Sequence, residues 1–363
     1  MARYSHGISR RLALGVAALT MMAGGSIHAS ADPAETLKGS GSVVVSTWGG
    51  SYTDAQVKDF FAPFTAATGI EVITTGTPNA AKLKLMHESG NVEWDVVDAE
   101  AQMMYSAIAD GALAPIDYDL VYKVTPKADL IPTNLKEYGF PSISFGWVMA
   151  WNTDTVKGGQ DMTWADFWDT EKYPGRRALY AQPKPLLEIA LLADGVAPDK
   201  LYPLDLDRAF AKLDKIRPAI NVWFEDLGQS DVLLRNGEVD LMLTSNGRAH
   251  AAKQDGLKVD FTFNQGAWEQ GYWVIPAKGP NVENAQKLIA WTSQPEGQAQ
   301  FAASFGYGGP NIRSYEMIDD KVLAGLPTAP QNLPKQIAVD GEWWANNLEE
   351  VNRRWLEWYA QTK

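Results

Sequence analysis

The segment from Val43 to Asp54 reads VVVSTWGGSYTD and holds three local signals in succession. Its β-branched run is typical of a buried strand, and the two glycines after Trp48 indicate a tight turn. Thr53 or Asp54 is a suitable N-cap for the amphipathic stretch that follows. The segment therefore predicts a strand, a turn and a helix. Ligands of open α/β sheets bind outside the carboxyl ends of the strands, so Trp48 either lines such a crevice or packs half-buried in the loop.

Similar units follow along the chain. A helix over 54–67 is expected to end at Gly69, and a second helix over 79–89 at Gly90, each followed by a strand. Further expected strands are 70–74, 94–97, 177–180, 239–243 and 272–276, and further expected helices are 206–216 and 281–292. Repeated β-α-β units predict a mostly parallel sheet flanked by helices, which is an α/β fold. The extended stretch 142–152 is the expected boundary between two lobes, with a second crossing near 271–273.

The first 31 residues are predicted to be an export signal and not part of the fold. Arg3, Arg10 and Arg11 precede an apolar stretch over 12–22, and small residues at 29–31 suit a signal peptidase. The apolar stretch is too short for a membrane anchor, so release into the periplasm is expected. The paired arginines leave the twin-arginine route open as an alternative to the general one.

Composition excludes several classes of function. The chain has no cysteine, which rules out disulfides, iron-sulfur sites, thiol catalysis and a lipid-modified signal cysteine. Its net charge of −12 argues against nucleic acid or an anionic membrane as partner. Only His87 and His250 lie beyond the signal, so a multi-histidine metal site is not expected. We predict neither a metal nor a cofactor.

Arg248 is the most informative charged residue. It falls in the first turn of a helix that Ser245 or Asn246 is expected to cap, so its guanidinium and the free N–H groups of that turn can converge on an anion. Arginine also binds a carboxylate through two hydrogen bonds. The alternative is a surface salt bridge to a nearby acid such as Asp255.

Asp98 and Glu100 end another expected strand, and the strand period of two places them on one side. They are expected to be solvated strand-end acids, to receive an amine, or to act as a catalytic acid and base. Glu100, one step into the loop, is the better ligand candidate. A hydrolase or lyase built on this pair is disfavoured, because no nucleophile elbow, metal-ligand cluster or phosphate loop accompanies it.

Aromatic side chains gather near the same loops. Such walls pack against ligand methylenes and attract ammonium groups, although most aromatic residues belong to cores. Gln182 follows a strand in a proline-stiffened loop beside Lys184, and it either contacts ligand or is solvated. The aromatic candidates for ligand contact are Trp48, Tyr52, Trp268 and Tyr307.

Taken together, these motifs resemble the periplasmic spermidine/putrescine-binding proteins of ABC importers. The resemblance is collinear over nearly the whole mature chain and rests on Trp48, Trp94–Val97, Thr163–Trp168, Asn236–Asp240, Ser245–Gly247, Phe305–Asn311 and Gly341–Trp343. It implies a type II periplasmic binding fold with two α/β lobes, a ligand cleft between them and hinge closure. On this basis lobe 1 comprises 42–150 and 274–313, and lobe 2 comprises 151–273 and 314–363.

The ligand site departs from that family's pattern. Trp48 and Tyr307 match aromatic ligand contacts of that family. The acids that bind polyamine ammonium groups are not kept: their positions fall near Gln182, Pro185 and Gly271, although Glu269 is close to the last. Ser245 stands where the family has an aromatic residue, and Trp344 replaces a polar contact that follows Gly341–Trp343. Arg248 stands where the family tends to carry a small residue.

A polyamine would face a buried, unpaired Arg248, which is costly. We therefore expect a monomeric, non-enzymatic receptor that binds a carboxylate-bearing or zwitterionic solute and delivers it to an ABC permease. Polyamine binding through a repacked site is the alternative. The predicted ligand contacts are Trp48, Tyr52, Glu100, Gln182, Ser245, Arg248, Trp268 and Tyr307.

Overall fold

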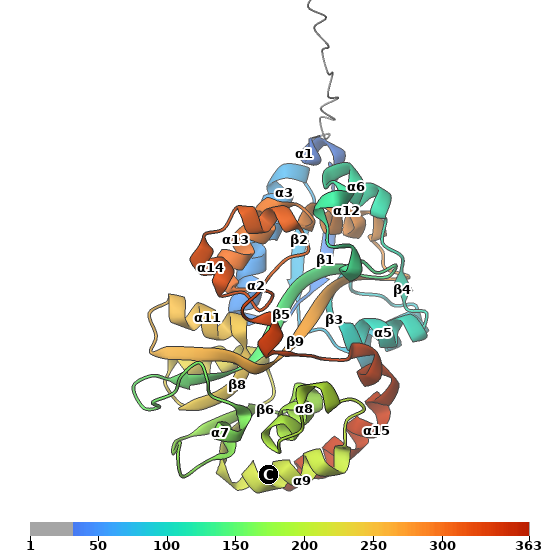
Figure 1. Cartoon of the computed structure of the whole chain (residues 1–363). Helices are drawn as coiled ribbons and strands as arrows, with labels where there is room; N and C mark the ends of the chain where they lie inside the picture. The colour runs from blue at the N-terminus through green and yellow to red at the C-terminus, as the bar shows by residue number, and fades with distance from the viewer. Residues whose placement is uncertain (1–31, 363) are drawn as a thin grey trace, which may run out of the picture.

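A computed structural model describes residues 32–362, and the expected signal segment lies outside them. Its main sheet has the strand order β2-β1-β3-β9-β5-β8-β6-β7, with the short strands β4 and β10 paired to β9 (Figure 1). The strands are β1 Ser42–Ser46, β2 Glu71–Thr75, β3 Val96–Glu100, β4 Leu113–Ala114, β5 Phe140–Asn152, β6 Arg177–Tyr180, β7 Ile220–Phe224, β8 Leu241–Ser245, β9 Val259–Pro276 and β10 Ile337–Ala338. β1 pairs in parallel with β2 and β3, and β6 with β7 and β8, as the repeated units predict.

Two long antiparallel strands, β5 and β9, join the two halves of this sheet. The last part of β9 pairs with β3, while the last part of β5 pairs with β8. Phe140 lies opposite Trp273 and Trp147 opposite Ala267, with two register shifts along the pair. In Figure 1, β1 to β3 therefore lie in the upper lobe and β6 and β8 in the lower one, with β5 and β9 passing between.

Helices cover both lobes. The helices of the upper lobe are α1 Pro33–Thr36, α2 Gly50–Gln56, α3 Ala62–Thr68, α4 Ala80–Ser89, α5 Ala101–Ala109, α6 Tyr118–Val124, α12 Val282–Thr292, α13 Pro295–Phe305 and α14 Asp320–Ala324. Those associated with the lower strands are α7 Trp164–Trp168, α8 Pro183–Ala193, α9 Leu206–Ile216, α10 Leu227–Arg235, α11 Asn246–Gln254 and α15 Gly341–Tyr359. Residues 312–316 pack on α13, and α14 lies beside it. Both segments therefore lie with the upper lobe, although residues 314–363 were assigned to lobe 2 from the sequence.

The start of α2 differs from the sequence prediction. The helix begins at Gly50, and Thr53, which was expected to cap it, lies inside its first turn. Gly49 and Gly50 both have positive φ and lead straight into the helix, while Thr53 Oγ1 accepts a hydrogen bond from the Gly49 N–H at 2.9 Å. The predicted N-cap at Thr53 or Asp54 is therefore wrong, because the glycine turn itself enters the helix.

The ends of the next helices agree with the local signals. The helical stretch that α2 begins passes through a π-helical turn at Val57–Phe61 and continues as α3 to Thr68, where Gly69 takes the left-handed conformation. Asn79 caps α4 by accepting a hydrogen bond from Lys82 N, and Gly90 ends it.

The long helix α15 contacts both lobes. Its buried side chains include Trp344, Val351, Trp355 and Trp358, the apolar stripe expected from their helical spacing. Its first turn lies against α5, while Trp344 Nε1 donates to Glu188 of α8 at 2.6 Å. The helix therefore bridges the two lobes.

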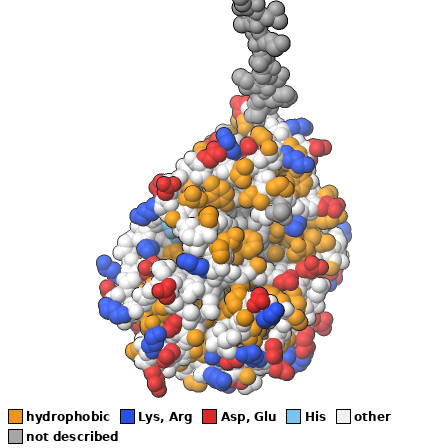
Figure 2. Space-filling model, in the orientation of Figure 1, with side chains coloured by type: hydrophobic (Ala, Val, Ile, Leu, Met, Phe, Trp, Pro, Cys, Tyr) orange, Lys and Arg blue, Asp and Glu red, His pale blue; other side chains and the backbone are white. Residues whose placement is uncertain are grey.

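Figure 2 shows acidic and basic side chains interspersed on the visible face, with hydrophobic side chains gathered over its middle. No helix in the described part of the chain combines the length and the apolar character that a membrane span needs.

Candidate ligand-binding site

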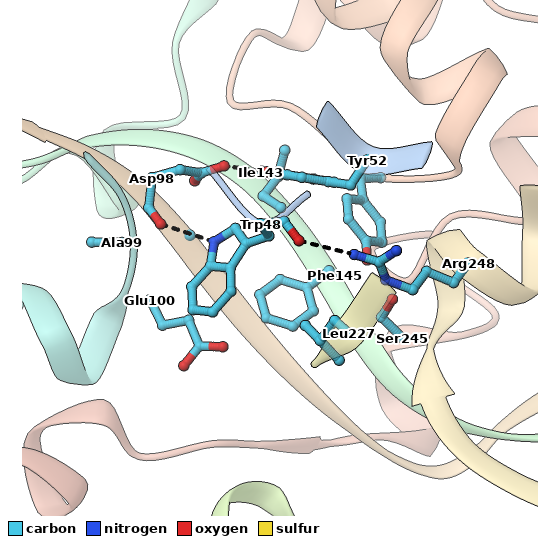
Figure 3. Close-up of a pocket in the computed structure, with 12 residues that line it drawn as sticks. Trp48, Tyr52, Asp98, Ala99, Glu100, Ile143, Phe145, Leu227, Ser245 and Arg248 are labelled. Carbon is cyan, nitrogen blue, oxygen red and sulfur yellow. Dashed lines mark hydrogen bonds between the residues drawn. The ribbon is translucent and has the colours of Figure 1, made fainter. Parts of the chain in front are cut away.

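A cavity lies at the carboxyl ends of β1, β3 and β8, where the two lobes meet (Figure 3). It holds about 390 Å³ of empty space, part of it open to solvent. The predicted contacts Trp48, Tyr52, Glu100, Ser245, Arg248 and Tyr307 all line it. Its other lining residues are Asp98, Ala99, Ile143, Phe145, Leu227 and Gly271. We call this the inner cavity.

Aromatic side chains form the walls of the inner cavity. The Trp48 indole N–H donates to the carbonyl oxygen of Asp98 at 2.9 Å, which fixes the orientation of the ring. Tyr307 packs against Tyr52 and Phe145, with ring centroids 5.9 and 5.7 Å apart. Burial raises the pKa of both tyrosines, so their hydroxyl groups remain protonated at physiological pH.

Asp98 holds the aromatic wall in place through hydrogen bonds to Trp48 and Tyr52. It is 1% exposed, and its carboxylate accepts hydrogen bonds from Tyr52 Oη, Gln56 Nε2 and Ser142 Oγ. Burial raises its pKa to about 6, although the three hydrogen bonds oppose that shift. A carboxylate held by three side chains of the protein positions Tyr52 and is not a free catalytic acid or base.

Arg248 marks one end of the inner cavity. It stands in the first turn of α11, as predicted, and its side chain is 2% exposed. Its Nη1 lies 2.7 Å from Asp231 of α10. The proposed alternative partner, Asp255, instead pairs with Arg235 at 2.6 Å. The alternative hypothesis of a surface salt bridge to Asp255 is therefore wrong, because the start of α11 points Arg248 inward while Asp255 follows the helix at its exposed end.

Asp231 also holds the turn after β1. Its Oδ2 accepts from Ser51 Oγ at 2.8 Å, and a Cβ atom placed on Gly50 would come within 2.9 Å of it. Arg248 Nη2 makes long contacts to the carbonyl oxygens of Trp48 and Gly49, at 3.5 and 3.4 Å. Arg248 is therefore paired, contrary to the expectation of an unpaired cation, because α10 packs against the turn before α2.

Hydrogen-bonding capacity remains at this end of the cavity. Among the described residues no partner accepts from Arg248 Nε, and the contacts to Nη2 are long. Ser245 is 2% exposed, and its Oγ forms no well-aligned hydrogen bond in the described part of the chain, although the Tyr307 hydroxyl is close. A guanidinium and a serine hydroxyl can thus bind an anion together.

Glu100 marks the other end, and Trp48 and Phe145 lie between it and Arg248 (Figure 3). Its Oε2 lies 2.5 Å from Lys184 Nζ, and Glu269 lies 2.8 Å from the same nitrogen. Burial disfavours the charge on Lys184, but the two carboxylates outweigh it and raise the pKa of the ammonium. Burial also raises the pKa of Glu269 to about 7, with Lys184 opposing the shift.

A second, larger cavity adjoins the first and shares Trp48 and Glu100 with it. This outer cavity holds about 1310 Å³ of empty space, including open solvent, and Gln182 lines it together with Lys184 and Trp344. The structure therefore places Gln182 outside the inner cavity, in the adjoining chamber.

Trp268 lines neither of these two cavities. It pairs with Gly146 across β5 and β9, and that face of the sheet is covered by Pro327 and Gln336. Glu269, the next residue, pairs with the cavity residue Phe145 on the opposite face. The alternation of side chains along β9 therefore directs Trp268 away from the ligand site predicted for it.

Asp231, Asp98 and Phe145 were not among the predicted contacts. Asp98 was noted as a strand-end acid, but Asp231 lies in the middle of a helix where no local signal separates it from a solvated acid. Within residues 32–362, no group of three or more His, Cys, Asp or Glu side chains could hold a metal ion.

Groups of opposite charge at the two ends of an interlobe cavity in an α/β fold suit the binding of a small solute. The family model for bacterial extracellular solute-binding proteins matches residues 59–328, and the chain belongs to this family.

Similar proteins match most of its length. The gamma-aminobutyric acid-binding protein of Pseudomonas aeruginosa is 34% identical over 88% of this chain and 91% of its own length. The spermidine/putrescine-binding periplasmic protein of Escherichia coli is 26% identical over 86% of this chain and 90% of its own. The structure of the binding protein AgtB from A. tumefaciens R10 in complex with agropinic acid superimposes with a TM-score of 0.81. It is 33% identical and covers 88% of this chain and 98% of that one.

Proposed function

We propose that this protein is the periplasmic receptor of an ABC importer for a small solute that carries a carboxylate at one end and an amino or hydroxyl group at the other. It acts as a monomer, closes its lobes on the solute and delivers it to a membrane permease. The lobes divide near 142–152 and 271–273, and the first 31 residues direct export. The names of the similar proteins, one for gamma-aminobutyric acid (GABA) and one for agropinic acid, support this ligand class.

The observation that carries the proposal is the arrangement of the inner cavity. The buried guanidinium of Arg248 and the hydroxyl of Ser245 stand at one end, and Glu100 stands at the other. A carboxylate accepts hydrogen bonds from the first pair through its two oxygens. Glu100 Oε1 accepts none within the described residues, so it can receive an ammonium or a hydroxyl group. The aromatic walls then pack on the methylene groups between.

A set of four-carbon ligands tests this ligand class by calorimetry. GABA, succinate and putrescine share one chain length and differ only in their end groups. We expect GABA to bind more tightly than succinate, because Glu100 favours an ammonium over a carboxylate, and succinate more tightly than putrescine, because Arg248 attracts a carboxylate and repels an ammonium. Native mass spectrometry of protein purified without added ligand should find a bound carboxylate. Tightest binding of putrescine, or a co-purified polyamine, would overturn the proposal.

A further inference from the structure

Lys184 occupies the middle of a compact charged cluster. Its Nζ lies 2.5 Å from Glu100 of β3 and 2.8 Å from Glu269 of β9, and its side chain is 8% exposed. The other oxygen of Glu269 accepts the indole N–H of Trp147 at 2.6 Å. The two carboxylates thus converge on one nitrogen in a buried position, which is the geometry of a site for an ammonium group.

The lining of the outer cavity around this cluster is also mainly acidic among its charged residues. The charged residues that line it are Glu100, Glu225, Asp226 and Lys184, so Lys184 is the single cation among its described lining residues. Its aromatic lining residues are Trp48, Tyr180 and Trp344. Carboxylates and aromatic faces both attract ammonium groups, so this chamber without Lys184 would favour cations.

We propose that Lys184 is a specificity-determining residue whose tethered ammonium fills a cation subsite between Glu100 and Glu269 and so excludes diamines. The inference rests on the proposed function only in taking this cleft as the ligand site. A tethered ammonium occupies the subsite without the translational entropy that a free amine must lose on binding. A diamine therefore has to displace Lys184, which leaves that ammonium without its partners, or bind beside it, where two ammonium groups share two carboxylates and repel each other.

The test compares putrescine binding by calorimetry at pH 8 in the wild-type protein and three variants. Lys184→Met keeps the length of the side chain and removes the ammonium, and we expect putrescine to bind at least tenfold more tightly to it than to the wild type. Lys184→Arg keeps a cation and should show no gain. In Lys184→Met/Glu269→Gln one carboxylate is lost as well, and the gain should fall to threefold or less.

Folding of each variant is checked by thermal melting before titration. Should Lys184→Met fail to fold, Lys184→Gln supplies the same test, because its amide can hydrogen-bond both carboxylates without a charge. A folded uncharged variant with unchanged putrescine affinity would overturn the inference, and so would an equal gain in Lys184→Arg.

This outcome is separate from that of the proposed function. The ranking of the four-carbon ligands in the wild type tests carboxylate recognition, whereas the gain for putrescine on loss of Lys184 tests the cation subsite.

Discussion

The two ends of the cleft each hold a buried cation, and the two cations are paired differently. Lys184 faces two carboxylates at 2.5 and 2.8 Å, whereas Arg248 faces one carboxylate at 2.7 Å and two carbonyl oxygens at 3.4 Å or more. Arginine also has five donors where lysine has three. Lys184 is thus satisfied by the protein itself, while Arg248 retains donors for a ligand.

The comparison predicts that the Lys184 end contributes more than the Arg248 end to the free energy of unfolding. Lys184→Met leaves Glu100 and Glu269 facing each other in a buried site, so the free energy of unfolding should fall by about 3 kcal/mol. Urea denaturation at pH 8 measures it. Lys38→Met is the control, because Lys38 and its partner Glu35 are 67% and 72% exposed and their pair contributes about 0–1 kcal/mol. Equal losses in the two variants would show that the Lys184 cluster is no stronger than a surface pair.

The Arg248 end should carry more of the binding. Arg248→Gln removes the charge that receives the carboxylate, and we expect GABA affinity to fall about 100-fold, or roughly 2.7 kcal/mol. Arg235→Gln is the matched control, because Arg235 forms an arginine–aspartate pair from α10 that lies outside the two cavities described above. Calorimetry should find the control within twofold of wild type. A similar loss in both variants would mean that Arg248 acts only through stability.

Much of the fold could be predicted because its signals are local. A glycine after an apolar-periodic stretch commonly ends a helix, and Gly69 and Gly90 do so here. The β-branched run of β1 likewise forms the expected strand. Trp48, Ser245 and Arg248 could be placed at a ligand site because each follows the carboxyl end of a strand, where open α/β sheets bind their ligands.

The pairing within the site could not be predicted in the same way. Glu269 and Lys184 are 85 positions apart, and Arg248 and Asp231 are 17 apart on different helices. Which acid meets which cation depends on how α8 and α10 pack against β3, β9 and α2, and the sequence pattern of one element does not contain that. The face occupied by Trp268 depends on the register of β5 against β9, which a single strand leaves open.

A buried acid near the middle of the cleft predicts a pH effect. Burial raises the pKa of Asp98 from its ordinary value to about 6, so the folded protein binds a proton that the unfolded chain has already lost. Its contribution to stability is therefore present below pH 4 and is lost as the pH rises to 6, by an amount on the order of 2–3 kcal/mol. Asp98→Asn should remove that decline when urea denaturation is repeated from pH 4 to 7. Parallel pH profiles of the two proteins would contradict the assignment.

The smallest effect concerns the wall between the two ends. Trp48 lines both cavities, and its ring packs where the methylene groups of a ligand would pass. Trp48→Leu loses aromatic contact worth about 1 kcal/mol and should weaken GABA binding about fivefold, whereas Trp48→Phe keeps a ring and should stay within twofold. Trp268→Leu is the control, because Trp268 lies on the opposite face of β9 from the cavity. A loss in Trp268→Leu as large as that in Trp48→Leu would place both rings on the ligand, and the face assigned to β9 would then be wrong. A loss confined to Trp48 would place its ring on the ligand, between the charged groups that set which solute binds.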